Sequence, residues 1–225
     1  MLPFTRRHFV KSSTLLTAGL VLTGIHGLIP EPGWGANSEF LQASCGIEKQ
    51  AVKKMLIAYA SMHGSTGKVA DVLAKDLCAA GASVDIRLVR NVKDLSPYQA
   101  VVVGSAIRSD RWLPEATEFV ASHRSILRNL PTAYFLTCLT LAKPSAEIQT
   151  RVESFLNPVR EEVPEVKPAS TGLFAGVLDY TKYGTAIKAV MKYKMWTKGV
   201  EEGDYRDWRA IHAWADQLKS AFLPA

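Results

Sequence analysis

A short polar loop, Ser61 to Gly67, holds the residues of this sequence best suited to bind a small anion. It follows an apolar run at 55–60 and precedes a helical pattern with Val69, Leu73 and Leu77 on one face. This order indicates a strand, a loop and a helix. Hydroxyl groups and the free N–H groups of a helix N-terminus converge in such a loop, and both favour a doubly charged phosphate. The sequence therefore predicts a phosphate site at residues 61–67.

Several known motifs do not fit this loop. A nucleoside-triphosphate loop needs a glycine where Met62 stands and a hydroxyl residue where Val69 follows Lys68. The first glycine of a dinucleotide fingerprint is missing, and a serine nucleophile at Ser65 would need a glycine in place of His63. A monophosphate cradle remains, formed by Ser61, His63, Ser65 and Thr66 around Gly64 and Gly67.

Further strand and helix patterns alternate along the chain from residue 54. The expected strands are 55–60, 83–89, 100–105, 132–138 and 170–176. Segment 83–89 alternates polar and apolar residues, as an edge strand does, whereas 100–105 is almost wholly apolar and belongs at the centre of a sheet. Strands alternating with helices form a parallel sheet with right-handed crossovers. The fold class is thus α/β with three layers, and ligands bind at the carboxyl ends of the strands.

The polar loop resembles the phosphate loop of the flavodoxin family, which has a hydroxyl residue, any residue, threonine, glycine, any residue and threonine after the first strand. Ser61, Gly64 and Thr66 match, and His63 replaces the central threonine. Within that family, the chain most resembles the menaquinone-dependent protoporphyrinogen oxidases, over about residues 54–222. The similar segments are Gly104–Arg108, Leu141–Pro144, Phe174–Gly176 and Ile187–Trp208. The resemblance implies a flavodoxin-like five-stranded parallel sheet of order 2-1-3-4-5 with helices on both faces.

The resemblance also implies an FMN cofactor. Its phosphate would lie on Ser61, Met62, His63, Gly64, Ser65, Thr66 and Gly67, and its ring against Ser105, Ala106, Ile107, Arg108, Thr137, Cys138 and Leu139. Arg108 is the candidate catalytic residue, either stabilising reduced flavin or holding an anionic substrate; the alternative is a solvated loop arginine. Trp112 either stacks on the ring or belongs to the core. His63 is a further candidate, for proton transfer, although the cofactor carries most of the chemistry in such sites.

The N-terminus resembles a twin-arginine export signal, because Arg6 and Arg7 precede an apolar run at 14–29. That run is short for a bilayer span, which needs about 20 residues. Ala36 is the best candidate for the cleavage point, and an uncleaved anchor is the alternative. We therefore expect a signal peptide at 1–36, a linker at 37–53 and a flavodoxin-like FMN-binding domain at 54–225.

Three cysteines, Cys45, Cys78 and Cys138, show neither a close pair nor metal-ligand spacing. We therefore expect no disulfide framework and no metal site, and the odd cysteine is expected to be buried instead of reactive. Lipid modification of Cys45 is an alternative outcome of export.

The chain is basic, with a formal charge of +6. Segment 180–199 combines lysines with aromatic residues and has no acidic residue. This composition indicates either a face for a membrane surface or a quinone, or an ordinary solvated helix. The export signal argues against nucleic acid as a partner.

These observations together predict an exported FMN oxidoreductase that passes electrons between a small redox substrate and a quinone. It would reach the periplasm or the outer face of the cytoplasmic membrane through the Tat translocase, which carries folded proteins and so suits a cofactor loaded in the cytoplasm. Two alternatives remain: an electron carrier without its own substrate, and a flavin-free module with this fold. The basic charge counts against a carrier, because the soluble carriers of the family are acidic.

Overall fold

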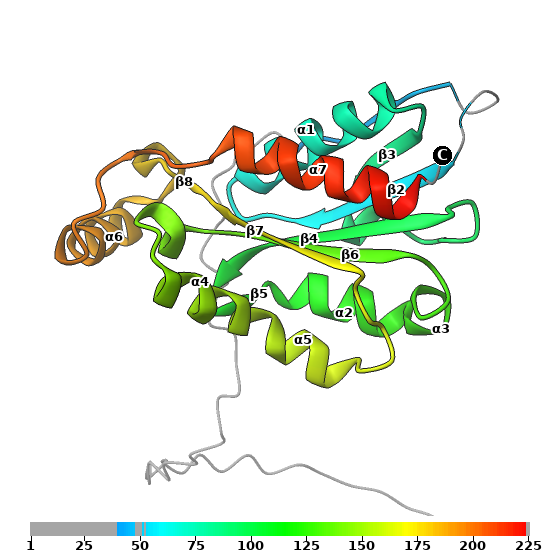
Figure 1. Cartoon of the computed structure of the whole chain (residues 1–225). Coiled ribbons are helices and arrows are strands. Elements are labelled where there is room, and N and C mark those ends of the chain that lie inside the picture. The colour runs from blue at the N-terminus through cyan, green and yellow to red at the C-terminus, as the bar shows by residue number, and fades with distance from the viewer. Residues whose placement is uncertain (1–39, 48–50, 52, 224–225) are drawn as a thin grey trace, which may run out of the picture. The chain divides into compact units, whose positions relative to one another are not determined.

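The computed structural model describes residues 40–47, 51 and 53–223 (Figure 1). The strands are β1 (Ala43–Cys45), β2 (Lys54–Ala60), β3 (Ser83–Leu88), β4 (Ala100–Arg108), β5 (Arg111–Trp112), β6 (Thr132–Cys138), β7 (Ser170–Ala175), β8 (Val177–Leu178) and β9 (Gly203–Asp204). The helices are α1 (Ser65–Ala79), α2 (Pro114–Ser122), α3 (Arg124–Leu127), α4 (Ala146–Glu153), α5 (Asn157–Glu162), α6 (Thr185–Thr197) and α7 (Trp208–Phe222). Short 3-10 turns lie at Val89–Asn91 (η2), Leu139–Ala142 (η3), Ser154–Leu156 (η4) and Tyr180–Lys182 (η5).

Five parallel strands form the body of the main sheet. Their order is β3-β2-β4-β6-β7, which confirms the expected order 2-1-3-4-5. The strand order reverses at β2 and β4, because the chain moves first to β3 and then crosses back to β4. In sheets of this kind the reversal point opens a crevice at the carboxyl ends of the strands.

Helices cover both faces of this sheet, so the expected three-layer α/β class is confirmed. Figure 1 shows α1 and α7 on one face and α2, α4 and α5 on the other. Side chains of β2 alternate between the two layers, as the period of a strand requires. Met55, Ile57 and Tyr59 are fully buried in the core of the first layer, whereas Leu56 and Ala58 are fully buried in the second. Both faces of β2 are therefore buried, and the strand ends where the polar loop begins.

Part of the segment expected to be a linker is ordered as β1. This strand pairs antiparallel with β3, so β3 is not the outermost strand, contrary to the prediction. A disulfide joins Cys45 of β1 to Cys78 of α1 across 33 residues of sequence, and the prediction that the cysteines would not pair was wrong in this respect. A strand of three residues leaves no periodic signal, and the spacing of the cysteines gives no indication that the fold brings Cys45 beside α1.

Strand β4 also extends beyond its expected end and turns back as a hairpin. Ser109 and Asp110 occupy the left-handed region, with φ of 53° and 60°, and Ile107 pairs with Trp112 in β5. Two such residues make a tight turn that suits the twist of a hairpin. Ser-Asp is not one of the usual turn pairs for this geometry, so the sequence gives no hairpin signal at this point.

The expected signal peptide at 1–36 and residues 37–39 of the expected linker lie outside the described residues. Within the described part of the chain, no helix is both long and apolar enough to cross a membrane.

Candidate functional site

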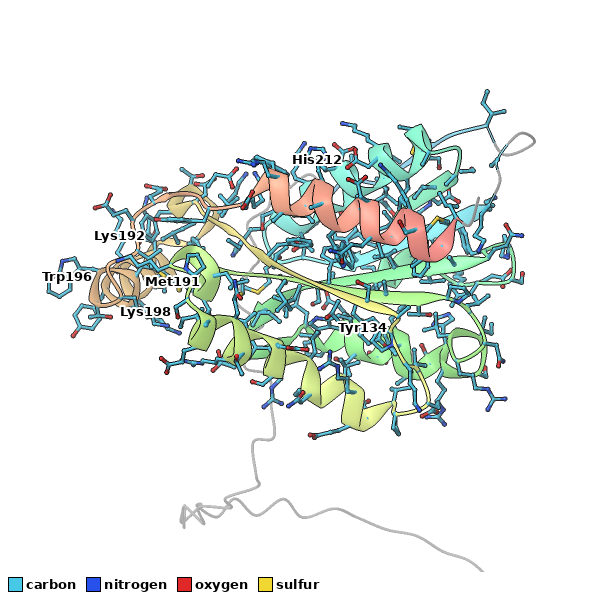
Figure 2. All side chains as sticks on the ribbon, viewed as in Figure 1. Tyr134, Met191, Lys192, Trp196, Lys198 and His212 are labelled. Carbon is cyan, nitrogen blue, oxygen red and sulfur yellow. A yellow bond between two sulfur atoms is a disulfide. The ribbon has the colours of Figure 1, made fainter. Side chains whose placement is uncertain are left out.

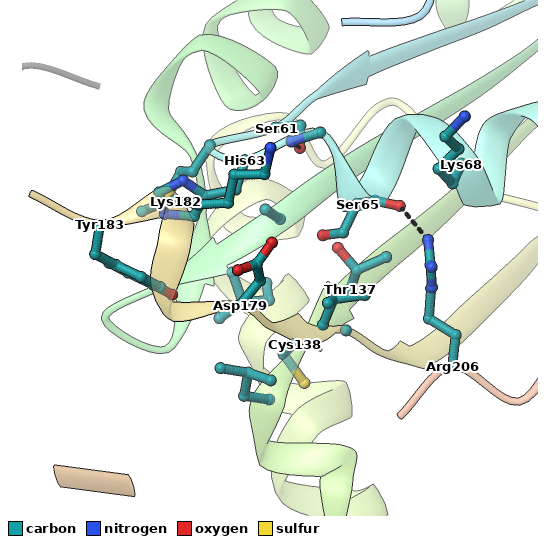
Figure 3. Close-up of a pocket in the computed structure, with 17 residues that line it drawn as sticks. Ser61, His63, Ser65, Lys68, Thr137, Cys138, Asp179, Lys182, Tyr183 and Arg206 are labelled. Atoms are coloured by element: carbon teal, nitrogen blue, oxygen red, sulfur yellow. Dashed lines mark hydrogen bonds between the residues drawn. The ribbon is translucent and has the colours of Figure 1, made fainter. Parts of the chain in front are cut away.

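A pocket of about 500 Å³ lies at the carboxyl ends of β2, β4, β6 and β7 (Figure 3). Its lining comes from the polar loop, the ends of β4 and β6, and the segments that follow β7. The lining residues are Ser61, Met62, His63, Gly64, Ser65, Lys68, Ala106, Ile107, Thr137, Cys138, Leu139, Gly176, Val177, Asp179, Lys182, Tyr183 and Arg206. Small-molecule sites in proteins typically have volumes of about 300–1,000 Å³, so the pocket is large enough for a nucleotide-sized ligand.

The polar loop is shaped to bind an anion at the start of α1. Gly64 has a φ of 85°, and its N–H donates to Ser61 Oγ over 2.9 Å. The chain thus turns sharply, and α1 begins at Ser65 with no acidic residue in its first turn. Free N–H groups and the positive end of the helix dipole favour a negative charge at this point. A glycine is required at residue 64, because side chains of L residues are strained at this φ.

Thr66 and Gly67, which were predicted to contact the phosphate, do not line the pocket. They pack against the strands next to the loop and support it. Thr66 is fully buried, and its Oγ1 lies 2.8 Å from Oγ1 of Thr137 at the end of β6. Gly67 packs against Tyr59, since a Cβ at residue 67 would lie 2.7 Å from Tyr59 Oη. Both predictions placed the residues in the right loop, but their observed contacts are with neighbouring strands.

The residues predicted to contact the ring at the end of β4 form a second wall. Some of them line the pocket, and others support it from behind. Ala106 and Ile107 line the pocket. Ser105 is fully buried; its Oγ donates to the carbonyl of Ala106 and accepts the N–H of Leu113, so it holds the hairpin in place. Arg108 is exposed and is not among the lining residues, so the geometry gives no support to the catalytic role expected for it.

Trp112 belongs to the core and does not lie at the pocket. Its side chain is 2% exposed and makes an edge contact with the ring of Tyr134, with centroids 4.9 Å apart. The structure thus decides between the two expectations for this residue. Burial beside Trp112 also raises the pKa of Tyr134, which therefore stays a neutral phenol.

The third predicted wall, Thr137 to Leu139, lines the pocket in full. Cys138 is a buried free thiol, as expected of the odd cysteine. Burial raises its pKa, which disfavours the reactive thiolate. This wall therefore supplies shape and one hydroxyl group, and no nucleophile.

A fourth wall, formed by residues that follow β7, was not predicted. Tyr183 covers His63, with ring centroids 4.6 Å apart, and Asp179 and Lys182 lie close by. Burial lowers the pKa of His63; Asp179 opposes this shift and Lys182 adds to it. His63 is therefore held neutral near pH 7 in the protein alone, and a neutral imidazole can donate at one nitrogen and accept at the other.

Arg206 closes the pocket beside the polar loop and was also missed. Its Nη1 donates to the carbonyl of Ser65 over 3.4 Å, as Figure 3 shows, and its Nη2 pairs with Asp204 Oδ2 over 2.5 Å. The guanidinium lies 4.5 Å from the ring centroid of Trp208, and the side chain is 12% exposed. The sequence shows only a basic residue two positions before the final helix, and its role becomes visible only when the fold brings it to the start of α1.

The family model described as a flavodoxin domain matches residues 56–204, which is more than half of the chain. The chain belongs to the flavodoxin domain family. The match spans all four walls of the pocket up to Lys182 and Tyr183. It ends just before Arg206, so the last basic residue that lines the pocket lies outside the matched region.

Among its curated relatives, this flavodoxin domain is similar to two protoporphyrinogen IX dehydrogenases (quinone). The protein from Leishmania major is 29% identical over 184 residues, covering 76% of each chain. The protein from Escherichia coli K12 is 26% identical over 175 residues, covering 73% of this chain and 94% of the relative.

Solved structures of flavodoxins are also similar. Oxidised flavodoxin 2 from Bacillus cereus is 21% identical with a TM-score of 0.45, covering 75% of this chain and 99% of that one. A flavodoxin from Streptococcus pneumoniae is 16% identical with a TM-score of 0.46, covering 74% and 98%.

Proposed function

We propose that this flavodoxin domain binds FMN and acts as an oxidoreductase between a small reduced substrate and a quinone. The observation that carries the proposal is the pocket itself, in which a hydroxyl-rich helix N-terminus, Lys68 and Arg206 lie together at one end (Figure 3), while the other walls supply most of the apolar lining. A flavin mononucleotide has the same division between a phosphate and a large ring.

The residues at the polar end fit a phosphate dianion. Ser61 and Ser65 supply hydroxyl groups, and the N–H groups of the first turn of α1 add donors. Lys68 and Arg206 bring positive charge to the same end. Arg206 is partly neutralised by Asp204, yet it remains nearly buried, which strengthens its attraction for a bound anion.

The residues at the other end fit a flat ring. Ala106, Ile107, Leu139 and Val177 offer apolar contacts, and Tyr183 offers an aromatic one. The charged side chains of Asp179 and Lys182 lie beside His63 and Tyr183 and can contact the polar edge of the ring. Bound FMN would supply hydride or single-electron transfer, which no side chain in the pocket can supply. The contribution of the chain is to hold the ring, exclude water and place His63 and Tyr183 at the rim. Burial raises the pKa of Tyr183, so its hydroxyl stays protonated and can donate a hydrogen bond.

The partners are proposed from the relatives. Two relatives are named for oxidation of protoporphyrinogen IX with a quinone, and their likeness extends over most of this chain. We therefore propose a quinone as the electron acceptor and a reduced small molecule as the donor, with protoporphyrinogen IX as the first donor to test.

Export through the twin-arginine route, to the periplasm or the outer face of the cytoplasmic membrane, is part of the same proposal. It rests on the sequence around Arg6 and Arg7. The disulfide between Cys45 and Cys78 supports it, because disulfides persist mainly in oxidising compartments.

The visible absorption spectrum of the purified protein is the first test, repeated after heat has released any bound cofactor. We expect flavin bands near one equivalent and FMN in the released fraction. Protoporphyrinogen IX should then bleach the flavin bands without oxygen, and a soluble menaquinone analogue should restore them. A colourless protein that takes up no added FMN would contradict the proposal. Bleaching by a partner protein alone would reject the enzyme and favour an electron carrier.

A further inference from the structure

Helix α6 exposes an apolar face that the fold does not use. Figure 1 shows the helix at one end of the domain, away from the two helical layers. Four large apolar side chains on it are exposed: Ile187 at 40%, Val190 at 65%, Tyr193 at 69% and Trp196 at 76%. In the rest of the described chain, the exposed large apolar side chains are Ile47 and Ile126, which lie apart from each other. Such a cluster on one helix normally marks an interaction site.

The opposite face of α6 attaches the helix to the domain. Met195 is 5% exposed, and it packs with Met191 against a small cluster that includes Leu178, Tyr180 and Val200. Figure 2 shows Met191 on the side of the body, whereas Trp196 points away from it. The outer face can therefore change without loss of the contacts that hold the helix.

Lysines border the outer face on both sides. A helix turns by about 100° per residue, so Val190, Tyr193 and Trp196 form one stripe. The same geometry places the exposed Lys194 and Lys198 along one edge of the stripe. Beyond the other edge lie the half-buried Lys188 and also Lys192, whose Nζ is 5.4 Å from the ring centroid of Tyr180. No acidic residue occurs between residues 180 and 199. A helix with an aromatic and apolar face between rows of lysine is suited to lie in the interface of an anionic membrane.

We infer that α6 docks the domain on an anionic lipid surface through Val190, Tyr193 and Trp196. The helix has 13 residues, short of the roughly 20 needed to span a bilayer, so it would lie along the interface. The sequence indicated residues 180–199 as a possible membrane face. The structure limits this face to α6, because Tyr180 is buried and Tyr183 covers His63 in the pocket.

Docking of α6 would bring the pocket close to the membrane. Lys182 and Tyr183 line the pocket, and α6 begins at Thr185. Leu139 both lines the pocket and packs against the cluster beneath α6. A lipophilic quinone dissolved in the bilayer would then lie near the ring end of the pocket. Only this last step rests on the proposed function, since docking itself requires neither flavin nor quinone.

Vesicle flotation of the full chain tests the inference. Vesicles of phosphatidylglycerol and phosphatidylcholine are compared with vesicles of phosphatidylcholine alone, and we expect binding to the anionic vesicles that weakens with salt. The triple variant V190Q/Y193Q/W196Q should bind about tenfold less tightly. The variant K194Q/K198Q should lose about tenfold as well, whereas K93Q/K167Q, which removes the same charge from exposed sites elsewhere, should bind as the wild type does.

A site-specific probe separates α6 from the apolar N-terminal run, which could itself bind lipid. An environment-sensitive fluorophore is attached to a cysteine introduced as Val190→Cys, and the control carries it as Ile126→Cys. On anionic vesicles the emission at 190 should rise and shift to the blue, and that at 126 should not. Flotation without a change at 190 would overturn the inference, and so would failure to float, which would leave the outer face to a protein partner. Flavin content is measured on the same samples. A protein that carries FMN but does not dock contradicts the docking inference alone, whereas a protein that docks without FMN contradicts the proposed function alone.

Discussion

Among the side chains of the pocket, Arg206 offers the sharpest test of how the phosphate end works. It bonds to the carbonyl of Ser65 and is nearly buried, so its charge is felt at the start of α1. We expect Arg206→Gln to weaken FMN binding by about tenfold or more, because a hydrogen bond to a charged group contributes roughly 1.5–3 kcal/mol. Riboflavin, which lacks the phosphate, should bind both proteins alike. The control is Arg209→Gln, which removes an exposed charge on α7. Equal losses for FMN and riboflavin would assign Arg206 a structural role instead.

His63 should make the stability of the flavin-free protein depend on pH. Its pKa is lowered by burial, while in the unfolded chain it returns to about 6.5. As the pH falls through 6.5, the unfolded chain binds a proton that the folded protein does not, so the free energy of unfolding decreases. His63→Gln should remove this part of the decrease. Urea unfolding at pH 7.5 and 5.5, in buffer without phosphate, measures it. Identical changes in the two proteins would show that His63 titrates normally in the fold.

At the scale of single elements, the disulfide between β1 and α1 should matter most for stability. Joining residues 33 apart removes freedom from the unfolded chain, which corresponds to about 3–4 kcal/mol in the entropic treatment of cross-links. We expect C45S/C78S to lower the melting temperature and to raise hydrogen exchange in β1, because β1 is short and, among the described strands, pairs with β3 alone. Cys138→Ala should keep the wild-type response to a reducing agent. A melting temperature that is insensitive to reductant would show that the pairing of β1 needs no covalent support.

The elements differ in how far the sequence predicts them, and the reason is the range of the interactions that form them. Strands β2, β4 and β6 are continuous apolar runs, so their place in a doubly covered sheet could be derived from local pattern. The polar loop could be found for the same reason, since Ser61 to Gly67 are adjacent in sequence. By contrast, β1 exists through its partner strand, and Arg206 reaches Ser65 across 141 residues. Thr66 and Gly67 show that a motif can locate a loop without assigning the contacts of each residue. Only the packing reveals which residues face a ligand and which hold the loop.

At the scale of the whole molecule, the proposed export sets an order for cofactor loading and disulfide formation that can be tested. FMN would be loaded in the cytoplasm, where thiols stay reduced, and the bond between Cys45 and Cys78 would form after export. We expect the conservative change Arg6→Lys/Arg7→Lys to keep the protein in the cytoplasm with FMN bound and both thiols open to alkylation after denaturation. The wild-type protein in the periplasmic or membrane fraction should carry FMN and resist alkylation at both cysteines. The matched control is Lys53→Arg/Lys54→Arg, which leaves the arginine pair intact. A disulfide already formed in the retained variant would separate cysteine pairing from export and remove its support for a periplasmic location.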